Sequence, residues 1–458
     1  MTFTQGSGAH FIGIGGVGMS AIAKVLLERG VRISGSDLKR SRPATMLEAM
    51  GASVGIGHDP SNLTEPYPDV VVVSSAVPSS NPELLRAREL GIEVMSRGEA
   101  LAALLKGARS VVVAGTHGKT TTTSMIVSTL RSAGVDPTYL VGGGLNDAGT
   151  NAKHGRDAWT IAESDESDGS FLFLSPTIAV VTNVEADHLD YWGSEAAVFE
   201  AFGRFLGSVP ESGAAIVPRR DERLKAEAEA TGRRVVTFGD GGDIGAEQRD
   251  YETGGARFSL VTDRGRADVQ LRVPGAHNVD NALAATAACL ELGVEVDAIA
   301  RGLSAFSGVE RRFQVRGSAG GVTVIDDYAH HPTEIKATLA AARPGPWRRV
   351  IAVFQPHRYS RTATFSHAFG GSFDAADRIV VTGVYGAGEQ PVPGITGKLV
   401  ADSVCSHLPG RPVAYLPHRR ELLAYLHASV RPGDVVLTLG AGDITSVGEE
   451  LLEGMEAS

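Results

Sequence analysis

The sequence predicts an α/β fold of about three domains, and three observations lead to this prediction. Short apolar runs of strand length alternate with helical patterns along almost the whole chain, which is typical of parallel sheets covered by helices. The chain has 458 residues, and domains commonly hold roughly 150 residues each. Two glycine-rich turns, each placed between a strand and a helix, mark the openings of two separate α/β blocks.

The first block is expected to extend from the N-terminus to about residue 107. A strand at 10–14 enters a glycine turn, and the helix at 19–29 ends before Gly30, a residue type that commonly terminates helices. Further short strands are expected at 31–34, 70–74 and 91–94. Repeated strand–helix–strand units of this kind predict a parallel, twisted sheet with helices on both faces.

The second block opens with a strand at 110–114, and the third begins near Val309. In the second block we expect helices at 120–134, 200–206, 221–230 and 278–292, and strands at 159–163, 178–183, 234–238, 256–261 and 268–273. The segment 239–255 is rich in Gly and Asp, which predicts turns. In the third block we expect a helix at 333–343 and strands at 322–326, 349–354, 378–382 and 434–439.

Composition and charge disfavour several classes of protein. Hydrophobic residues make up 43% of the chain and charged residues 21%, so the chain can fill real cores. Lys and Arg number 43 against 53 Asp and Glu, and this net charge of −10 disfavours broad nucleic-acid or membrane-surface binding. The two cysteines, Cys289 and Cys405, are too few for a disulfide framework. Without an export signal or a membrane-length apolar run, a cytoplasmic enzyme is expected.

The first glycine turn reads GIGGVG and matches the G-x-G-x-x-G pattern. Without side chains at Gly13, Gly15, Gly16 and Gly18, the backbone can approach a diphosphate, and amides at the helix start meet its charge. Asp37 lies at the end of the second expected strand, where a carboxylate can bind a ribose hydroxyl. A merely tight turn is the alternative, and the pattern does not separate a nicotinamide cofactor from a UDP-sugar.

The second glycine turn reads GTHGKTT and also lies between a strand and a helix. Counted from Ala114, it is similar to a P-loop shortened by one residue. Lys119 is expected to contact the β- and γ-phosphates of a nucleotide, and the Thr120 hydroxyl to bind magnesium. The backbone amides expected to surround the phosphates belong to Gly115, Thr116, His117, Gly118, Lys119, Thr120 and Thr121.

Two acidic segments follow strands of the same block. Glu163 ends the strand at 159–163 and begins the run ESDESD, and carboxylates beside a P-loop are suitable oxygen ligands for magnesium. The segment 182–190 follows the next strand, and its His188 is a candidate second metal ligand or phosphate contact. A solvated loop is the alternative for the remaining acids.

Taken together, these motifs resemble the Mur ligase family along nearly the whole chain. Eleven segments match in order, which is far more specific than any one motif. They are 10–20 (HFIGIGGVGMS), 34–37 (SGSD), 73–76 (VSSA), 115–122 (GTHGKTTT), 163–168 (ESDESD), 182–190 (TNVEADHLD), 274–282 (PGAHNVDNA), 308–313 (GVERRF), 326–334 (DDYAHHPTE), 354–362 (FQPHRYSRT) and 440–444 (GAGDI).

The resemblance implies three domains and an ordered synthesis of an amide. The domains would be a Rossmann-like UDP-N-acetylmuramate-binding domain at 1–107, a P-loop-type ATP-binding domain at 108–308, and a Rossmann-like domain at 309–458 that closes over the amino acid and ATP. With Mg²⁺ as cofactor, ATP would phosphorylate the lactyl carboxylate of UDP-N-acetylmuramate, and L-alanine would then attack the acyl phosphate. The resemblance therefore implies a cytoplasmic ligase of peptidoglycan synthesis, monomeric or homodimeric, without nucleic acid or membrane insertion.

The resemblance also implies roles for individual residues. The UDP-sugar would contact Gly13, Gly15, Gly16, Gly18, Asp37, Ser74, Ser75 and Arg97. ATP would contact the second glycine turn together with Asn281, Arg312 and Asp327. Thr120 and Glu163 would bind a first magnesium ion and His188 a second. The catalytic set would be Lys119, His188, Arg312, His330, His357, Arg358 and Arg361, and the amino-acid pocket would consist of Tyr328, His330, His357, Arg358 and Arg361.

The chain departs from the family pattern at two places. Ala329 stands where the family usually has glycine, between Tyr328 and His330. Many relatives bridge their metals with a carbamylated lysine, but here no lysine lies between Lys153 and Lys225. The missing lysine agrees with the members that add L-alanine and argues against the later-acting members.

Several alternatives stay open at this point. Asn278 and Asn281 are candidates for capping the following helix, since Asn is a favoured N-cap residue, and Asp326 is a candidate brace for its loop. The segment YGAGE at 385–389 varies the family pattern Y-A-A-G-E, and Glu389 is expected to occupy the position of the glutamate in that pattern. For the whole chain, the alternatives are a ligase that recycles peptides onto UDP-N-acetylmuramate, a nicotinamide-dependent dehydrogenase, and a nucleotide-sensing binding protein.

Overall fold

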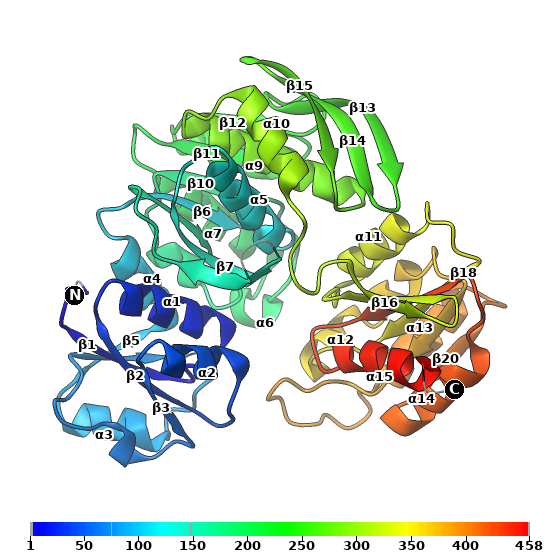
Figure 1. The fold of residues 1–458 in the computed structure, drawn as a ribbon, viewed down its shortest axis with the longest axis horizontal. Coiled ribbons are helices and arrows are strands. Elements are labelled where there is room, and N and C mark those ends of the chain that lie inside the picture. Colours follow the sequence, from blue (N-terminus) through cyan, green and yellow to red (C-terminus); the bar gives the residue numbers. More distant parts are fainter. Residues whose placement is uncertain (1–2, 75, 147–148, 457–458) are drawn as a thin grey trace. The chain divides into compact units, whose positions relative to one another are not determined.

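The computed structural model describes residues 3–74, 76–146 and 149–456, and these form two compact units. The first unit comprises Met1–Gln248, Phe258–Gln270 and Asp280–Ser307, and the second comprises Arg249–Arg257, Leu271–Val279 and Gly308–Ser458. Helices and strands alternate along much of the chain, and Figure 1 labels them. None of the helices in the described part of the chain combines the length and hydropathy that crossing a bilayer requires.

The first sheet has five parallel strands in the order β3-β2-β1-β4-β5. Its elements are β1 (Gly8–Ile12), α1 (Val17–Glu28), β2 (Arg32–Asp37), α2 (Arg42–Ala49), β3 (Ser53–Ile56), η1 (Pro60–Asn62), β4 (Val70–Val73), α3 (Pro82–Glu89), β5 (Glu93–Ser96) and α4 (Arg97–Leu105). The strand order reverses between β1 and β4. In open parallel sheets, ligands bind at the carboxyl ends of the strands beside such a reversal, which is where the first glycine turn leaves β1.

The helices of this block begin and end at residues suited to those positions. The Ser41 hydroxyl accepts a hydrogen bond from the Ala44 amide at the start of α2, and Ser96 forms a capping box with Glu99 at the start of α4. Gly30 follows the end of α1 with a φ of +82°, so its predicted role in ending that helix is confirmed.

The second sheet has seven strands in the order β12-β11-β10-β6-β9-β7-β8, with β6 at its centre. Its strands are β6 (Arg109–Ala114), β7 (Thr138–Leu145), β8 (Thr150–Lys153), β9 (Trp159–Glu163), β10 (Ile178–Val181), β11 (Ala214–Pro218) and β12 (Val235–Phe238). The accompanying helices are α5 (Lys119–Ser132), η2 (Ser170–Phe173), α6 (Leu189–Trp192), α7 (Glu195–Gly207), α8 (Glu222–Ala230), α9 (Ala276–Glu291) and α10 (Val296–Ala305). Because β9 and β10 flank β6 as parallel neighbours, both acidic segments emerge at the same sheet edge as the second glycine turn.

A separate sheet of three strands corrects one expectation. It consists of β13 (Gly245–Glu252), β14 (Gly255–Thr262) and β15 (Gly265–Leu271). The prediction of turns across 239–255 is therefore wrong for the residues of β13. This strand lies at the sheet edge and none of its residues is fully buried, so it has no apolar period that would reveal it in the sequence.

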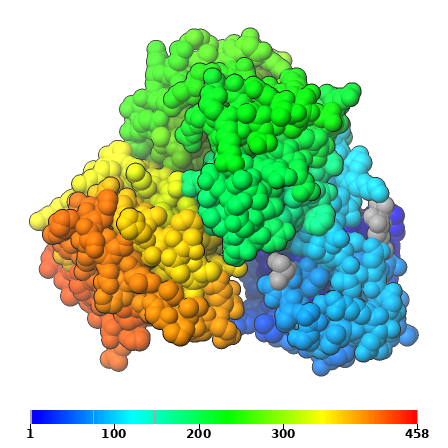
Figure 2. All heavy atoms as spheres, turned by 180° about the vertical axis from the view of Figure 1, so that it is seen from behind, coloured from blue at the N-terminus to red at the C-terminus, as the bar shows by residue number. Residues whose placement is uncertain are grey.

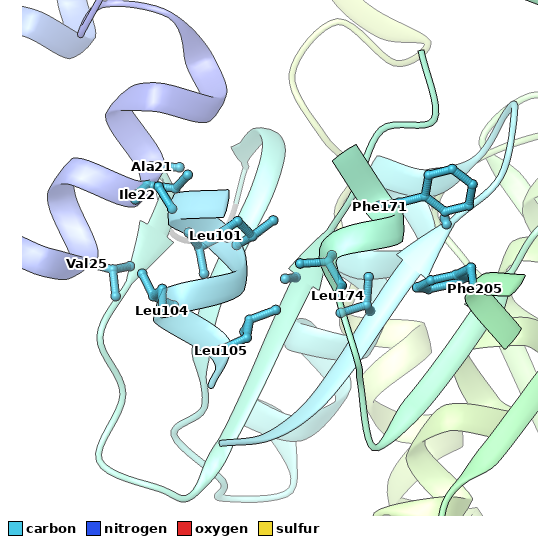
Figure 3. Packing of buried hydrophobic residues seen from close by; sticks show 14 of the residues in the cluster. Ala21, Ile22, Val25, Leu101, Leu104, Leu105, Phe171, Leu174 and Phe205 are labelled. Atoms are coloured by element: carbon cyan, nitrogen blue, oxygen red, sulfur yellow. The ribbon is translucent and has the colours of Figure 1, made fainter. Parts of the chain in front are cut away.

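One hydrophobic core extends through the first and second sheets. Val25 of α1 and Leu104 of α4 belong to the same buried cluster as Leu174 and Phe205 of the second block, and Figure 3 shows the packing from close by. Polar contacts join the same elements, since Lys24 Nζ lies 2.6 Å from the Thr150 hydroxyl of β8. The helix that follows the first glycine turn is thus fixed against β7 and β8 of the neighbouring sheet.

The sheet of the second unit has six strands in the order β16-β17-β21-β18-β19-β20. Its strands are β16 (Gln314–Ala319), β17 (Val322–Asp327), β18 (Arg349–Phe354), β19 (Arg378–Val381), β20 (Val413–Tyr415) and β21 (Asp434–Leu439). The helices are α11 (Pro332–Ala342), α12 (Tyr359–Phe365), η3 (Ala368–Ser372), α13 (Gly397–His407), α14 (Arg419–Ser429) and α15 (Thr445–Glu456). Figure 2 shows the atoms after residue 308, yellow to red, as one continuous body.

Candidate functional site

The first glycine turn is held by the backbone of the neighbouring strand. The amides of Gly13 and Ile14 both donate to the carbonyl oxygen of Ser36 in β2, at 2.8 and 3.0 Å. Gly13 has a φ of +83°, a conformation that favours glycine, and Gly16 is the N-cap residue of α1. The turn therefore presents the start of α1 at the carboxyl edge of the sheet, in the arrangement that binds phosphates in other proteins.

Asp37 contacts this turn directly. Its Oδ2 accepts a hydrogen bond from the Gly15 amide at 2.9 Å. A Cβ atom at Gly15 would lie 2.8 Å from that oxygen and 2.4 Å from the hydroxyl of Ser41. Glycine at position 15 is thus required by close packing, and the acid predicted to bind ribose also fixes the turn.

The remaining candidates for the UDP-sugar differ in how closely they approach the turn. Arg97 begins α4, and a Cβ atom at Gly18 would lie 3.2 Å from its Cδ and Nη1 atoms. Its Nη2 atom also lies 3.3 Å from Asp168 Oδ2. Ser74 is farther away, with its Cβ 3.9 Å from where a Cβ of Gly13 would be. Ser75 lies outside the described residues.

Replacing Gly15 with alanine is expected to weaken binding of the UDP-sugar that the family resemblance implies for this turn. The new methyl group would displace Asp37 or Ser41 and distort the turn, and overpacking of this kind costs roughly 1–3 kcal/mol. We expect the KM for the UDP-sugar to rise about tenfold or more, with the KM for ATP unchanged. Steady-state kinetics would measure this, with Gly245→Ala as control because the nearest atom to its added Cβ is 3.8 Å away. An unchanged KM for the UDP-sugar would contradict the expectation.

The second glycine turn is shaped by β10 and α9. Gly118, with a φ of +81°, is the N-cap residue of α5, and a Cβ there would lie 2.4 Å from Asn281 Oδ1. Asn183 accepts from the His117 amide through Oδ1 at 2.9 Å and from the Thr116 amide through its carbonyl at 3.0 Å. The sequence reasoning missed Asn183 as a residue of the turn's framework, although it lies in the TNVEADHLD segment.

Neither of the two asparagines considered as helix caps lies at the N-cap position of the helix. Both Asn278 and Asn281 lie inside α9, which begins at Ala276. Asn278 instead donates to the carbonyl oxygen of Pro274 at 2.7 Å, and Thr122 of α5 donates to Asn281 Oδ1 at 3.3 Å. Asn281 therefore lies directly behind the second glycine turn.

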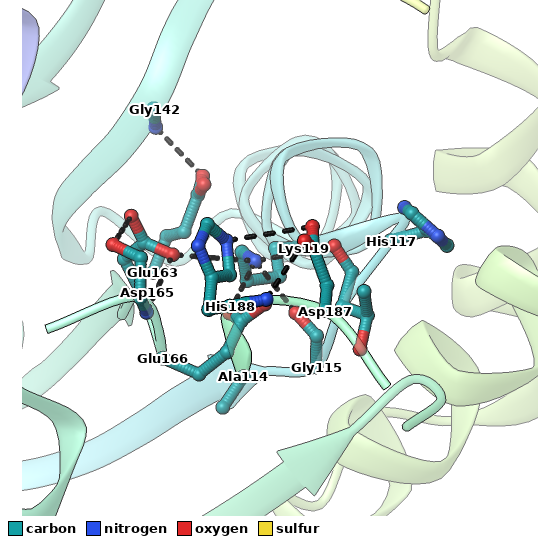
Figure 4. Close-up of polar contacts among 12 residues, drawn as sticks. Ala114, Gly115, His117, Lys119, Gly142, Glu163, Asp165, Glu166, Asp187 and His188 are labelled. Carbon is teal, nitrogen blue, oxygen red and sulfur yellow. Dashed lines mark hydrogen bonds and ion pairs between the residues drawn. The ribbon is translucent and has the colours of Figure 1, made fainter. Parts of the chain in front are cut away.

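Lys119 lies among the carboxylates of the first acidic segment (Figure 4). Its Nζ is 2.6 Å from Glu166 Oε2, 3.6 Å from Asp165 Oδ1 and 2.6 Å from the carbonyl oxygen of Gly115. Burial alone would lower the pKa of Lys119, but the carboxylates of Glu166 and Asp165 outweigh it and raise the pKa. Burial raises the pKa of Glu166 to about 8, and Asp165 acts in the same direction. Glu163, Asp165 and Glu166 thus all act on this one ammonium, and such a surplus of carboxyl groups suits a divalent cation.

Glu163 and Thr120 form a suitable pair of magnesium ligands. The Thr120 hydroxyl donates to Glu163 Oε1 at 3.0 Å, and the Gly142 amide donates to Glu163 Oε2 at 2.7 Å. Mg²⁺ prefers oxygen ligands of this kind, a carboxylate and a hydroxyl beside nucleotide phosphates. The two residues predicted to share the metal are therefore brought together. Gly142 was not among the predicted site residues.

His188 lies beside the same cluster (Figure 4). Its φ of +55° is unusual for a residue other than glycine, and it is the N-cap residue of α6. The ring Nε2 lies 3.5 Å from Asp187 Oδ2, and the charge of His188 acts on Asp165. The second acidic segment therefore directs an imidazole, a common metal ligand, toward the acids around Lys119.

In the second unit, Asp327 lies at the end of β17 and accepts two backbone hydrogen bonds. The amides of Phe313 and Ala329 donate to its two oxygens, each at 2.7 Å. Burial raises the pKa of Asp327 to about 6, and the charge of Arg312 opposes this rise. Ala329 is fully buried here, so the methyl group that replaces the family's glycine is accommodated.

Asp326 is fully buried and braces the loop that follows β21. Its Oδ2 accepts from Arg311 Nε at 3.1 Å and from the Thr445 hydroxyl at 2.8 Å, and its Oδ1 accepts from the Thr438 hydroxyl at 2.8 Å. Arg311 also donates to the carbonyl oxygen of Gly440 at 2.7 Å. Asp326 thus braces the loop after β21 rather than its own loop, and Arg311 shares this role. The sequence reasoning missed Arg311, because within the GVERRF segment it gave a role only to the next residue, Arg312.

The predicted phosphate-binding arginine, Arg312, lies near two other residues of this cluster. Its Nη1 is 3.6 Å from Glu334 Oε1, and its guanidinium carbon is 5.2 Å from the centre of the Tyr328 ring. The rings of Tyr328 and His330 are in turn 5.3 Å apart, edge to face. Arg312, Tyr328 and His330 are thus neighbours, as the prediction requires.

His357, Arg358 and Arg361 come from the start of α12 and complete this cluster. The rings of His330 and His357 are 5.5 Å apart, and Arg361 Nη1 lies 3.4 Å from His357 Nδ1. Burial lowers the pKa of His330 to about 3 and of His357 to about 4, so both rings are neutral near pH 7. The Nε of Arg358, a residue with a φ of +68°, lies 3.4 Å from Glu389 Oε1, so Glu389 adjoins this cluster.

Comparisons with known proteins agree along the chain. Family models match at residues 8–109 ("Mur ligase family, catalytic domain"), 113–289 ("Mur ligase middle domain") and 311–442 ("Mur ligase, glutamate ligase domain"). A UDP-N-acetylmuramate–L-alanine ligase of Mycolicibacterium vanbaalenii is 48% identical over 98% of this chain and 96% of its own.

Solved structures give the same result. The UDP-N-acetylmuramate-alanine ligase MurC from Thermotoga maritima matches with a TM-score of 0.83 and 30% identity, over 98% of this chain and 99% of its own. A murein peptide ligase from Psychrobacter arcticus matches with a TM-score of 0.74 and 25% identity, over 98% and 99%. The predicted resemblance and the predicted α/β fold are confirmed by these similarities.

Proposed function

The chain belongs to the Mur ligase family, and from this premise we propose that it joins L-alanine to the lactyl carboxylate of UDP-N-acetylmuramate. The reaction consumes ATP and yields ADP and phosphate. Relatives as similar as 48% over nearly the full length carry this activity in their names. The observation in the chain itself that supports it most is the cluster of Lys119, Thr120 and Glu163, which combines a phosphate-binding loop with ligands for magnesium.

In the first step, the carboxylate of the UDP-sugar attacks the γ-phosphorus of ATP. A carboxylate is a poor acyl donor, and phosphorylation supplies a leaving group. Catalysis of such a transfer consists mainly of positioning and of neutralising charge. Lys119 and the amides of its turn would bind the transferring phosphate, and Thr120 and Glu163, with His188, would hold Mg²⁺. The metal would supply further neutralisation of the phosphate oxygens.

In the second step, the amine of L-alanine attacks the acyl phosphate, and the tetrahedral intermediate expels phosphate. We assign Arg358 and Arg361 to the amino acid's carboxylate and to the departing phosphate, because guanidinium groups bind both kinds of oxyanion. The neutral rings of His330 and His357 would shape the pocket through hydrogen bonds, with Tyr328 beside them. Arg312 and Asp327 would contact the phosphates and the ribose of ATP.

The test is an assay of phosphate release with ATP, Mg²⁺, UDP-N-acetylmuramate and one amino acid at a time. We expect release that requires both the UDP-sugar and L-alanine. Release with a tripeptide but not with L-alanine would instead indicate a peptide-recycling ligase. Oxidation of NADH without ATP would contradict both functions and favour a dehydrogenase.

The peptide-recycling ligase is the second candidate because its fold is so similar. The structure from Psychrobacter arcticus matches 98% of the chain with a TM-score of 0.74. The fold therefore does not separate the two activities, whereas the full-length relatives at 45–48% identity are named as L-alanine ligases. The nicotinamide-dependent dehydrogenase loses its support, since it gives no role to the cluster around Lys119.

Three further features remain part of the proposal. The domains would have boundaries near 107/108 and 308/309, each with its own substrate. The protein would act in the cytoplasm, where nucleotide-linked precursors and ATP are available, as a monomer or homodimer. Magnesium would be the divalent cation.

A further inference from the structure

Both carboxylate oxygens of Glu163 are already bound within the protein. Oε1 accepts from the Thr120 hydroxyl at 3.0 Å, and Oε2 accepts from the backbone amide of Gly142 at 2.7 Å. The first contact lets the carboxylate and the hydroxyl face one cation together. The second contact comes from a different strand and fixes the rotation of the carboxylate about its own axis.

The Gly142 amide is available because β7 leaves its regular pairing at this point. Among the described residues, β7 pairs with β9 from Thr138 to Leu140, and the last partner on β9 is Ala162, directly before Glu163. Pairing of β7 with β8 also shifts between Leu140 and Leu145. The backbone amide that the ladder does not use is therefore directed at the carboxylate (Figure 4).

The space around Gly142 explains why this position is glycine. A Cβ atom there would lie 2.5 Å from Glu163 Oε1, 2.7 Å from Oε2 and 2.8 Å from Cδ, so the whole carboxylate would have to move. The φ of Gly142 is outside the left-handed region, so its backbone conformation is open to any residue. Proximity to Glu163, and not backbone conformation, is what excludes a larger side chain.

We propose that Gly142 is a positioning residue for the magnesium site: its amide orients Glu163, and its missing side chain leaves room for the carboxylate. The inference rests on the proposed role of Glu163 as a metal ligand. Groups that orient a metal ligand typically change metal affinity by about 10–100-fold when they are lost. Gly142 is exposed, so the carboxylate can turn toward solvent when displaced, and the fold itself is little affected.

The experiment measures Mn²⁺ binding to the full chain in the presence of ADP, by the loss of the free-Mn²⁺ paramagnetic resonance signal. In Gly142→Ala we expect the dissociation constant for Mn²⁺ to rise at least about tenfold, with the melting temperature unchanged within a few degrees. Gly254→Ala is the matched control, because its added Cβ has no atom within 4 Å and its φ is also outside the left-handed region. This control should bind Mn²⁺ as the unaltered chain does.

A double-variant cycle separates positioning from general damage. In a Glu163→Ala background, adding Gly142→Ala should change Mn²⁺ binding by less than about twofold, because the carboxylate it positions is gone. Glu163→Asp shortens the side chain and withdraws the carboxylate from the Gly142 amide, while the sequence of β7 stays unchanged. This variant should weaken Mn²⁺ binding as Gly142→Ala does. Unchanged binding in Gly142→Ala or in Glu163→Asp, or an undiminished effect in the Glu163→Ala background, would overturn the proposal. None of these measurements uses an amino acid, so a wrong assignment of L-alanine would leave the result intact.

Discussion

Replacing Lys119 with alanine is expected to abolish phosphate release while leaving the UDP-sugar bound. The ammonium lies 2.6 Å from Glu166 and 2.6 Å from the carbonyl oxygen of Gly115, at the start of α5. Lys119 is the only lysine or arginine in the sequence GTHGKTT of the turn. Loss of one preorganised charge that stabilises a transition state costs about 10²–10³ in rate, and we expect at least the larger value. Phosphate release measures the loss, and calorimetry measures binding of UDP-N-acetylmuramate.

The control for this variant must separate lost catalysis from lost stability. Without Lys119, the buried carboxyl group of Glu166 loses its ion-pair partner, which destabilises the fold. The double variant Lys119→Ala/Glu166→Gln removes that unpaired carboxyl group and should regain thermal stability but not activity. Lys153→Ala, which removes a partly exposed lysine paired with Asp136, should keep full activity. Loss of UDP-sugar binding together with phosphate release in Lys119→Ala would show that the two nucleotide sites are not separate.

Replacing Glu163 with glutamine is expected to lower phosphate release by about 10²-fold at a given Mg²⁺ concentration. The amide retains the shape of the side chain and the contact with Thr120, but it removes the negative charge that a divalent cation requires. Raising Mg²⁺ should recover part of the activity, because the loss is in metal affinity. Titration of phosphate release with Mg²⁺ would give the half-saturating concentration, which we expect to rise by about tenfold or more.

Asp190→Asn provides the matched control for Glu163→Gln. Asp190 belongs to the second acidic segment but is exposed at the start of α6. Its loss should leave the magnesium dependence unchanged. If Asp190→Asn and Glu163→Gln shift the magnesium dependence equally, the effect would arise from the net charge of the region and not from ligation.

The sequence allowed the parts of the site that depend on short-range order to be predicted. Each glycine turn lies between a strand and a helix that its own residues specify, so Lys119 and Gly13 occupy their predicted positions. Glu163 was predicted beside Thr120 because strand ends in a parallel sheet meet at one edge. Which strands lie next to each other could not be predicted in this way, because the order of strands in a sheet is set by contacts between segments distant in the sequence.

The residues that the sequence reasoning missed share this dependence on distant contacts. Gly142 contacts Glu163 because β7 lies next to β9, and Asn183 reaches His117 because β10 lies next to β6. Neither adjacency can be read from local composition. β13 was missed for the opposite reason, because a polar edge strand stabilised by its backbone hydrogen bonds leaves no hydrophobic pattern.

The core shared by the first two sheets has a consequence for how heat unfolds the chain. Val25 and Leu104 pack in the same buried cluster as Phe205. Unfolding of one sheet would therefore remove apolar contacts from the other sheet. The two sheets should therefore melt as one cooperative unit. A ligand bound to either sheet then raises the temperature at which both unfold, because binding to the native state alone stabilises everything that unfolds with it.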